Sequence, residues 1–500
     1  MAKTLSDLIP AEADGRGELA ATLTRTLDYD QLTNCMRCGF CLPACPTFRE
    51  TGIEAESPRG RIALMKAVAD GILDPDEAFE TQMNHCLGCR ACEPACPADV
   101  KYGRLLEQAR DSVERHTTTH RRWVKAARRA AFDGLFPHQN RMRLLGGALM
   151  LYQRTGLRKL ARGAGLMKLF PRHMREMESI LPDASYKGVA EQIGAFHPAK
   201  GERNATVGLF RGCIMDVLFT ETNKHTVELL NEAGFDVVIP ESQNCCGALH
   251  AHSGEQDGAK ALAKRNIAAF KAAGVEWIVS NAGGCGALLV EYGHLLHDDP
   301  QWANDAAWFA KRAIDVSKLL VEHGRLRPAA QAAIAAGAGS VVGGGAPGAA
   351  PASASGGGHA AGGGGGCGGS CGGGVGFASD EKVRITYQDS CHLRNVMRSS
   401  EAPRKLMRGV ANAEFVELFE AERCCGSAGI YNLTEPRMAG QILDHKMEHV
   451  KRTDAHYLLT SNPGCLLQMK HGIEKHGMSG QMKAVHLVDF LHERMRAGNV

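Results

Sequence analysis

The sequence predicts an α+β multidomain protein: a helical, cysteine-rich N-terminal part, a basic helical segment, and then two repeated α/β units with parallel sheets. Three observations support this fold class. Two cysteine runs of identical spacing lie close to the N-terminus, and a stretch rich in Lys and Arg follows them. The second half then alternates short apolar runs with helical patterns, which is typical of βαβ units around a parallel sheet.

The two cysteine runs share the spacing C-x2-C-x2-C-x3-C-P: Cys35, Cys38, Cys41 and Cys45 before Pro46, and Cys86, Cys89, Cys92 and Cys96 before Pro97. Bacterial two-cluster ferredoxins hold [4Fe–4S] clusters with this spacing, and the fourth cysteine of each run ligates the other cluster. The same rule assigns one cluster to Cys35, Cys38, Cys41 and Cys96, and the other to Cys86, Cys89, Cys92 and Cys45. Zinc sites use paired C-x2-C spacings with a longer gap, so they fit this pattern poorly.

The composition favours a cytoplasmic protein of several domains. The chain has 500 residues, 44% of them hydrophobic. No apolar run reaches the roughly 18–20 residues that span a bilayer, and the N-terminus has no signal-peptide pattern. Because the cytosol keeps thiols reduced, we expect the 18 cysteines to bind metal rather than form disulfides.

The patterns divide the chain into six predicted segments. They are an N-terminal helical arm (1–30), a two-cluster ferredoxin-like module (31–103), a basic helical region (104–200), a first cysteine-rich unit (201–336, unit one), a glycine-rich linker (337–376) and a second cysteine-rich unit (377–500, unit two). In the two-cluster module, the segment from Ser57 to Arg61 precedes a helical pattern of Ile62, Met65, Ala69 and Ile72. Arg59 and Arg61 either begin this helix or contact a cluster edge or an acidic partner.

The basic region carries 14 Lys and Arg against three acids between Arg121 and Glu178. One interpretation is a set of helices with solvated basic faces that pack on the two-cluster module. The other is a surface for an anionic membrane or an acidic partner subunit, since Trp123, Phe132, Phe136 and Phe170 are interleaved with the basic residues. No nucleic-acid reading motif is found, so we expect no nucleic-acid partner.

The second half contains an internal repeat of four cysteines. In unit one, Cys213 follows an apolar strand over 206–210, Cys245-Cys246-Gly247 comes after 31 residues, and Cys285 follows a strand over 277–279. In unit two, Cys391 follows a strand over 383–387, Cys424-Cys425-Gly426 comes after 32 residues, and Cys465 follows a strand over 457–459. The matching spacings predict two copies of one fold.

Loops after parallel strands gather at the carboxyl edge of the sheet, so each set of four cysteines should meet there. We expect Cys246-Gly247 and Cys425-Gly426 to open helices, whose N-termini favour thiolates. The eight cysteines are candidate ligands for one iron–sulfur cluster in each unit; zinc binding and buried structural thiols are the alternatives. His250, His252 and His392 lie beside these motifs, either as ligands or second-sphere partners, or as ordinary polar loop residues.

The segment 337–376 has 20 glycines in 40 residues and should be a flexible linker. It contains Cys367 and Cys371 with His359 nearby. We interpret these as incidental to a low-complexity insertion, with metal binding as the alternative.

These motifs together resemble the proteins that carry two cysteine-rich CCG domains behind a dicluster ferredoxin domain. This group includes the iron–sulfur subunits of glycolate oxidase, of lactate utilisation and of anaerobic glycerol-3-phosphate dehydrogenase, and heterodisulfide reductase. The segments from Asn34 to Cys41, Ser57 to Arg61 and His85 to Arg90, together with the long N-terminal arm, are most similar to the glycolate oxidase subunits.

The family pattern ends each unit with C-x-x-C, whereas this chain has Ala282-Gly283-Gly284-Cys285 and Asn462-Pro463-Gly464-Cys465. In heterodisulfide reductase, five cysteines per unit go with noncubane clusters that cleave a disulfide. The absent cysteine counts against that chemistry here, but four thiolates suffice for an ordinary cluster.

The resemblance implies an iron–sulfur electron-transfer subunit of a flavin-dependent 2-hydroxy-acid dehydrogenase. A flavoprotein partner would oxidise glycolate, and electrons would pass to a quinone at the inner face of the cytoplasmic membrane. No dinucleotide or flavin motif is found, so we expect this chain not to oxidise the hydroxy acid itself. The alternatives are a D-lactate or glycerol-3-phosphate dehydrogenase subunit, a thiol–disulfide reductase of the heterodisulfide reductase type, and a zinc-held scaffold.

Overall fold

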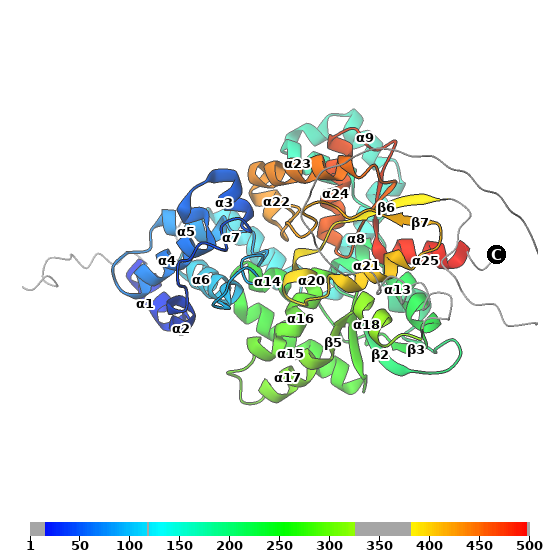
Figure 1. The fold of residues 1–500 in the computed structure, drawn as a ribbon, viewed down its shortest axis with the longest axis horizontal. Coiled ribbons are helices and arrows are strands. Elements are labelled where there is room, and N and C mark those ends of the chain that lie inside the picture. Colours follow the sequence, from blue (N-terminus) through cyan, green and yellow to red (C-terminus); the bar gives the residue numbers. More distant parts are fainter. Residues whose placement is uncertain (1–15, 118–119, 326–381, 498–500) are drawn as a thin grey trace, which may run out of the picture.

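The computed structural model describes residues 16–117, 120–325 and 382–497 (Figure 1). The predicted glycine-rich linker, with His359, Cys367 and Cys371, lies outside the described residues, as does the first half of the N-terminal arm. The predicted boundaries of the six segments remain predictions.

The N-terminal part is helical and forms one end of the molecule (Figure 1). Its elements are α1 (Arg16–Thr26), α2 (Tyr29–Thr33), α3 (Pro46–Thr51), the 3₁₀ turn η2 (Glu54–Glu56), α4 (Pro58–Ala69), α5 (Glu77–Asn84) and α6 (Tyr102–His116). Leu23, Met65, Met83 and Leu105 form the centre of its core. Ser57 accepts a hydrogen bond from the Gly60 N–H and so caps α4.

Helix α4 is shorter than the sequence pattern predicts. It ends at Ala69, Gly71 is left-handed, and the Ile72 side chain is 78% exposed. The prediction that the helical pattern extends to Ile72 was wrong, because a left-handed glycine ends the helix before that position.

The basic region is helical as predicted. It comprises α7 (Arg122–Arg129), the π-helical turn η3 (Ala130–Leu135), α8 (Gln139–Arg154), α9 (Leu157–Gly163), the 3₁₀ turn η4 (Leu166–Leu169), α10 (Arg172–Ser179) and α11 (Val189–Ile193). Helix α8 packs closely on unit one, since a Cβ at Gly146 would lie 2.4 Å from the Val217 side chain. Arg143 of α8 also pairs with the buried Asp216.

Unit one is a sheet of order β1-β3-β2-β4-β5 with helices between its strands. Its elements are β1 (Phe196–His197), β2 (Ala205–Phe210), α12 (Ile214–Leu218), α13 (Thr220–Glu232), β3 (Phe235–Val238), α14 (Ala248–His252), α15 (Gln256–Ala272), β4 (Trp277–Ser280), α16 (Gly283–Leu295), α17 (Ala303–Arg312), β5 (Ala313–Asp315) and α18 (Val316–Glu322). All pairings are parallel except that of the short edge strand β1, which runs antiparallel to β3.

Unit two has the order β7-β6-β8-β9, which repeats the order β3-β2-β4-β5 of unit one. Its elements are β6 (Val383–Tyr387), α20 (Cys391–Asn395), α21 (Glu401–Arg408), β7 (Ala413–Phe415), α22 (Tyr431–Thr434), α23 (Pro436–Arg452), β8 (Tyr457–Thr460), α24 (Pro463–Lys475), β9 (Lys483–His486) and α25 (Leu487–Ala497). All its strand pairs are parallel. The predicted repeat of two α/β units with parallel sheets is therefore confirmed.

One local prediction holds in unit one only. Helix α14 begins directly after Gly247, but no helix begins at Gly426, and α22 starts later at Tyr431. Ala428 and Gly429 have left-handed backbones, which are incompatible with a helix at that point.

The two units pack against each other reciprocally. Helix α13 of unit one contacts α25 of unit two, and α18 of unit one contacts α21 of unit two. In each pairing, an early helix of one unit (α13 or α21) contacts the last helix of the other unit (α25 or α18), as an approximate two-fold axis requires. One apolar core, which includes Val207, Leu230, Ile385 and Phe490, runs through both units.

No helix within the three described ranges is both long and apolar enough to cross a membrane.

Candidate iron–sulfur centres

The two N-terminal cysteine runs adopt the same turn. Arg37 and Gly39 in the first run, and Gly88 and Arg90 in the second, are left-handed at corresponding positions. This backbone is uncommon for a residue other than glycine. Its recurrence at both places indicates that the two loops present their cysteines in the same way.

The first predicted ligand set lies near the surface. Cys35, Cys38, Cys41 and Cys96 line one hollow, which Cys92 of the other set also reaches. Cys38 is exposed, whereas Cys35, Cys41 and Cys96 are half-buried. The fourth cysteine of the second run thus lies near the first three of the first run, and the exchange of ligands stays a prediction.

The second predicted set is buried. Burial and then the neighbouring Cys86 raise the pKa of Cys45, so these thiols from different runs face each other. Burial, followed by Cys89 and Cys86, also raises the pKa of Cys92 well above its ordinary value. Buried thiols that lie close enough to raise the pKa of Cys45, Cys89 and Cys92 suit a group that takes up their negative charge, as an iron–sulfur cluster does.

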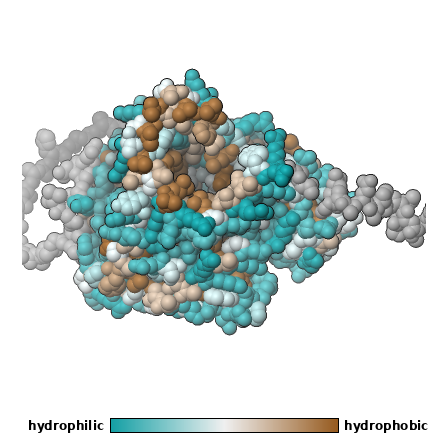
Figure 2. Space-filling view, turned by 180° about the vertical axis from the view of Figure 1, so that it is seen from behind, coloured by the Kyte–Doolittle hydropathy of each residue, from teal (hydrophilic) through white to brown (hydrophobic). Residues whose placement is uncertain are grey.

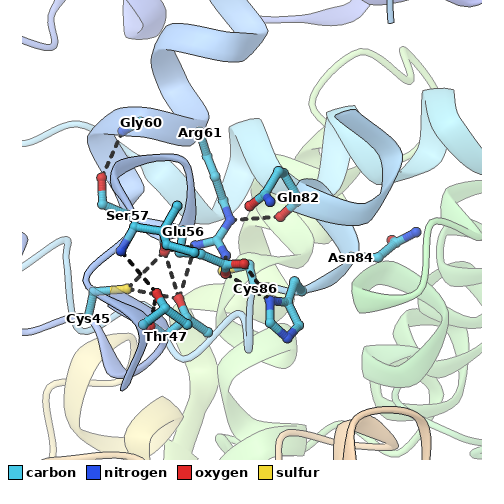
Figure 3. Close-up of polar contacts among 12 residues, drawn as sticks. Cys45, Thr47, Glu56, Ser57, Gly60, Arg61, Gln82, Asn84 and Cys86 are labelled. Carbon is cyan, nitrogen blue, oxygen red and sulfur yellow. Dashed lines mark hydrogen bonds and ion pairs between the residues drawn. The ribbon is translucent and has the colours of Figure 1, made fainter. Parts of the chain in front are cut away.

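Arg61 is fully buried beside this second set (Figure 3). Its guanidinium donates to the Gln82 carbonyl at 2.7 Å and to the Glu56 carboxylate at 2.9 Å. Glu56 also contacts His85 Nδ1 at 2.7 Å. Arg61 was expected either to begin the helix or to contact a cluster edge or an acidic partner. The structure supports a position beside the cluster site, because the positive charge of Arg61 interacts electrostatically with the Cys86 and Cys45 thiols. Arg59 pairs with Glu54 at 2.6 Å.

Cys86 is surrounded by donors and positive charge. Arg110 donates to the Cys86 carbonyl, and the Tyr102 hydroxyl donates to the Cys86 thiol at 3.5 Å. Burial alone would raise the pKa of Cys86, but Arg61 and Arg110 together lower it below its ordinary value. Sequence reasoning missed Arg110, because it lies on α6, well after the cysteine run, and no spacing rule connects the two.

The four thiols of unit one form a row. Cys213 Sγ lies 3.4 Å from Cys245 Sγ. Cys245 interacts electrostatically with Cys246, and Cys246 with Cys285. Cys285 lies in the first turn of α16, where the helix dipole favours a thiolate. The loops after β2, β3 and β4 thus bring the four candidates together at the predicted edge of the sheet.

The four thiols of unit two form the same row. Cys391 interacts electrostatically with Cys424, Cys424 with Cys425, and Cys425 with Cys465. Cys465 lies in the first turn of α24, as Cys285 does in α16. Each row supplies four adjacent sulfur donors, which fits one iron–sulfur cluster per unit.

The helices behind the two rows carry different groups. In unit one, Asn266 of α15 donates to the Cys245 carbonyl at 2.9 Å, and the Tyr292 hydroxyl donates to the Cys246 carbonyl at 2.7 Å. In unit two, α23 places Lys446 in the interior, where its ammonium group donates to the Glu420 carbonyl. Burial lowers the pKa of Lys446 to about 8, while the nearby Cys425 thiolate acts in the opposite direction. Sequence reasoning did not single out Lys446.

The second set of the two-cluster module abuts unit two. Cys89 shares an apolar cluster with Cys424, and Cys391 packs against it. Across this interface Asn395 donates to the Cys89 carbonyl at 2.9 Å, and the Tyr431 hydroxyl donates to the His85 carbonyl at 3.0 Å. Helix α23 also packs on α3 (Figure 1).

The three candidate histidines contact groups other than the thiols. His250 Nε2 lies 2.9 Å from the Phe132 carbonyl, His252 Nδ1 lies 2.9 Å from Glu107, and His392 Nε2 lies 3.0 Å from the Gly88 carbonyl. They join the basic region, α6 and the second cysteine loop to the two units. These contacts favour a structural role over ligation.

In the described part of the chain, no three cysteine, histidine or carboxylate side chains surround a point that could hold a single metal ion. None of the 16 described cysteines forms a disulfide.

Three families match this chain, in an order that agrees with the fold. A 4Fe-4S dicluster domain matches residues 31–100, the linker region of glycolate oxidase iron-sulfur subunits matches residues 123–181, and a cysteine-rich domain matches residues 207–289 and again 385–470. The two cysteine-rich matches coincide with the repeated α/β units. The family matches indicate that the chain binds iron–sulfur clusters.

Curated relatives agree with these matches. A probable glycolate oxidase iron-sulfur subunit of Bacillus subtilis (strain 168) is 48% identical over 468 residues, which cover 93% of this chain and 95% of the relative. The glycolate oxidase iron-sulfur subunit of Escherichia coli (strain K12) is 28% identical and covers 88% of this chain and 90% of the relative. Lactate utilization protein A of Oceanobacillus iheyensis is 29% identical over 58% of this chain and 98% of that protein.

Proposed function

This chain belongs to the family of glycolate oxidase iron-sulfur subunits, and on that premise we propose that it carries electrons in a complex that oxidises glycolate to glyoxylate. A flavoprotein subunit would oxidise the hydroxy acid, and this chain would relay electrons to an acceptor at the membrane. The observation that carries the proposal is that the cysteines of each predicted set lie near one another in the fold.

We propose the four ligand sets as the sequence predicts them. Two lie in the two-cluster module, and one lies in each unit. Bound iron–sulfur clusters would accept and release single electrons. The chain itself supplies thiolates, buries most of them away from water, and places Arg61, Arg110 and Lys446 where negative charge rises on reduction.

The first ligand set is the proposed entry point for electrons from the flavoprotein. Its hollow is near the surface, and the neighbouring side chains of Met36 and Phe40 are exposed, as is Ile53. Exposed apolar side chains beside a redox site suit a protein partner. The second set is fully buried and suits onward transfer within the chain.

We also propose that the basic region binds the inner face of the cytoplasmic membrane. Figure 2 shows apolar residues gathered around a hollow at one end of the molecule. Helices α8, α9 and the turn η4 expose large apolar side chains next to basic ones: Leu144, Leu145, Leu151, Leu157, Leu160, Leu166, Leu169 and Phe170. Such a surface combines apolar insertion with attraction to anionic lipids.

Vesicle binding tests the membrane role. Replacing Arg129, Arg154, Lys159 and Lys168 with Gln should abolish sedimentation of the holoprotein with phosphatidylglycerol vesicles at low salt. Replacing the exposed Lys311, Lys451, Arg452 and Lys483 removes equal charge elsewhere and should leave sedimentation intact. Equal binding by both variants would refute this part of the proposal.

Metal content tests the electron-transfer role. We expect anaerobically purified protein to contain about sixteen irons and as many sulfides, with cubane signals in electron paramagnetic resonance after reduction. A colourless protein with zinc in the thiol sites would instead support the zinc-held scaffold. Reduction of a disulfide substrate by the reduced protein would support the heterodisulfide reductase alternative.

The substrate is tested with the assembled complex. Glycolate, D-lactate and glycerol-3-phosphate should be compared as electron donors to the clusters through the flavoprotein. Faster cluster reduction by D-lactate or glycerol-3-phosphate than by glycolate would overturn the assignment of glycolate.

A further inference from the structure

The three parts that hold thiols do not contact one another equally. Cys89 of the two-cluster module packs with Cys391 and Cys424 of unit two. Cys285 of unit one packs in a cluster that contains Cys425 and Cys465 of unit two. No apolar cluster among the described residues joins a thiol of unit one to a cysteine of the two-cluster module. The thiols of unit two therefore pack with thiols of both other parts, although the two-cluster module also contacts unit one directly, where Arg90 pairs with Glu291 at 2.6 Å.

Asn462 spans the gap between the two units. The Gly284 N–H, one residue before Cys285, donates to Asn462 Oδ1 at 3.0 Å. Because a backbone N–H can only donate, the amide oxygen must face it. The Asn462 amide nitrogen therefore faces unit two, where it donates to Cys465 Sγ at 3.5 Å. One side chain thus connects the backbone beside one row of thiols to a sulfur atom of the other.

The Asn462 side chain does not act as an ordinary helix cap. Asn462 is the N-cap residue of α24, but its side chain caps no N–H of that helix. An asparagine at an N-cap ordinarily bonds to its own helix. Here the Asn462 side chain bonds to the Gly284 N–H and to Cys465 Sγ instead. Pro463, which lacks an N–H, is the first residue of α24.

Unit one has no counterpart to this bridge. Its corresponding N-cap residue is Ala282, which has no polar side chain. The Gly283 N–H instead donates to the Ser461 carbonyl of unit two at 2.9 Å. The Ser461 carbonyl and the Asn462 side chain of unit two therefore accept hydrogen bonds from the first two N–H groups of α16 in unit one.

We propose that unit two is the junction of the relay and that Asn462 is the positioning residue that couples its centre to that of unit one. Electrons pass between the two-cluster module and unit one through unit two. The Asn462 amide stabilises the reduced, more negative centre at Cys465 and holds the Cys285 loop against it. The proposal rests on the proposed electron-transfer function, and it assigns a role to the residue that stands where the family pattern has a cysteine.

The test is a redox titration of the reconstituted full-length protein, followed by electron paramagnetic resonance. Asn462→Ala should lower the ratio of reduced to oxidised centre in unit two by about tenfold at a given potential, which is a shift of about 59 mV for one electron. It should also reduce the magnetic interaction between the centres of the two units. The two clusters of the two-cluster module should titrate unchanged.

Two further variants separate coupling from folding. Asn462→Asp has the same size but presents oxygen to Cys465, and should lower the potential at least as far as Asn462→Ala. Asn432→Ala is the matched control, because Asn432 of unit two donates to Gln468 and not to a thiol. It should leave all potentials unchanged.

The outcomes distinguish this inference from the proposed function. Full iron content with unchanged potential and coupling in both Asn462 variants would overturn the inference while the relay stands. About eight irons, all in the two-cluster module, would overturn it as well and would limit the relay to that module.

Discussion

Units one and two have the same scaffold but place different charges around their thiols. Both run through the same strand order and arrange four thiols in a row. Unit one surrounds its row with neutral groups, Asn266 and Tyr292. Unit two adds a buried ammonium group, Lys446, and the amide of Asn462. A repeated fold can therefore hold two centres of different potential, since charge and hydrogen bonds to sulfur set that potential.

The largest expected effect comes from removing one thiol in each unit. In Cys391→Ser, unit two loses its centre, so we expect the centre of unit one to remain oxidised when the two-cluster module is reduced by the flavoprotein. In Cys213→Ser, only the centre of unit one should be lost, and unit two should still be reduced. Rapid freeze-quench electron paramagnetic resonance measures both. Normal reduction of unit one in Cys391→Ser would show that unit two is not the junction.

The next effect concerns the charge difference between the units. Lys446→Met should lower the potential of the centre in unit two only, by roughly 90 mV if loss of the cation costs about 2 kcal/mol of charge interaction. Lys451→Met, at an exposed site on the same helix, is the control. A similar shift of the centre in unit one would mean that the two environments are not independent.

A third difference lies where the last strand of each unit meets its final helix. Unit one has Asp315 there, and burial raises the pKa of this carboxyl to about 6 from its ordinary 3.8. Unit two has His486, whose pKa burial lowers. The unfolded Asp315 ionises first as pH rises, so the folded state loses stability from about pH 4 to pH 6, and the loss is complete above that range.

This Asp315 effect amounts to about 3 kcal/mol. Asp315→Asn keeps the oxygen that caps α18 and removes the ionisation. As the pH rises from 4 to 6, the denaturation midpoint of the wild type should therefore decrease relative to that of this variant. Above pH 6 the difference between the two midpoints should stay constant. If the midpoints of the wild type and of Asp315→Asn changed with pH in parallel, Asp315 would not ionise in this way.

The smallest effect concerns the neutral network of unit one. Tyr292→Phe removes the hydrogen bond to the Cys246 carbonyl and leaves Asn266 without its partner hydroxyl. We expect a loss of about 1 kcal/mol in the free energy of unfolding. The potential of the centre in unit two should not change. A change there would indicate that the network of unit one extends across the interface.

The sequence alone determined the repeat and predicted the thiol sets. Cysteine spacing indicates which thiols a single loop presents, because residues close in the chain set the shape of that loop. For the same reason the strands before Cys213 and Cys391 were predicted at nearly their observed bounds. Ile72 and the start of the helix after Gly426 were misplaced, because left-handed residues overrode the hydrophobic pattern there.

Only the tertiary structure decided how the sets are joined. The repeat makes the two units look equivalent, yet Asn395 of unit two bonds to the Cys89 carbonyl, whereas Glu291 of unit one pairs with the neighbouring Arg90. The buried positions of Arg110 and Lys446 likewise depend on how distant helices pack. Such contacts follow from the burial of apolar surface between the parts of the chain, and sequence spacing carries no information about which faces meet.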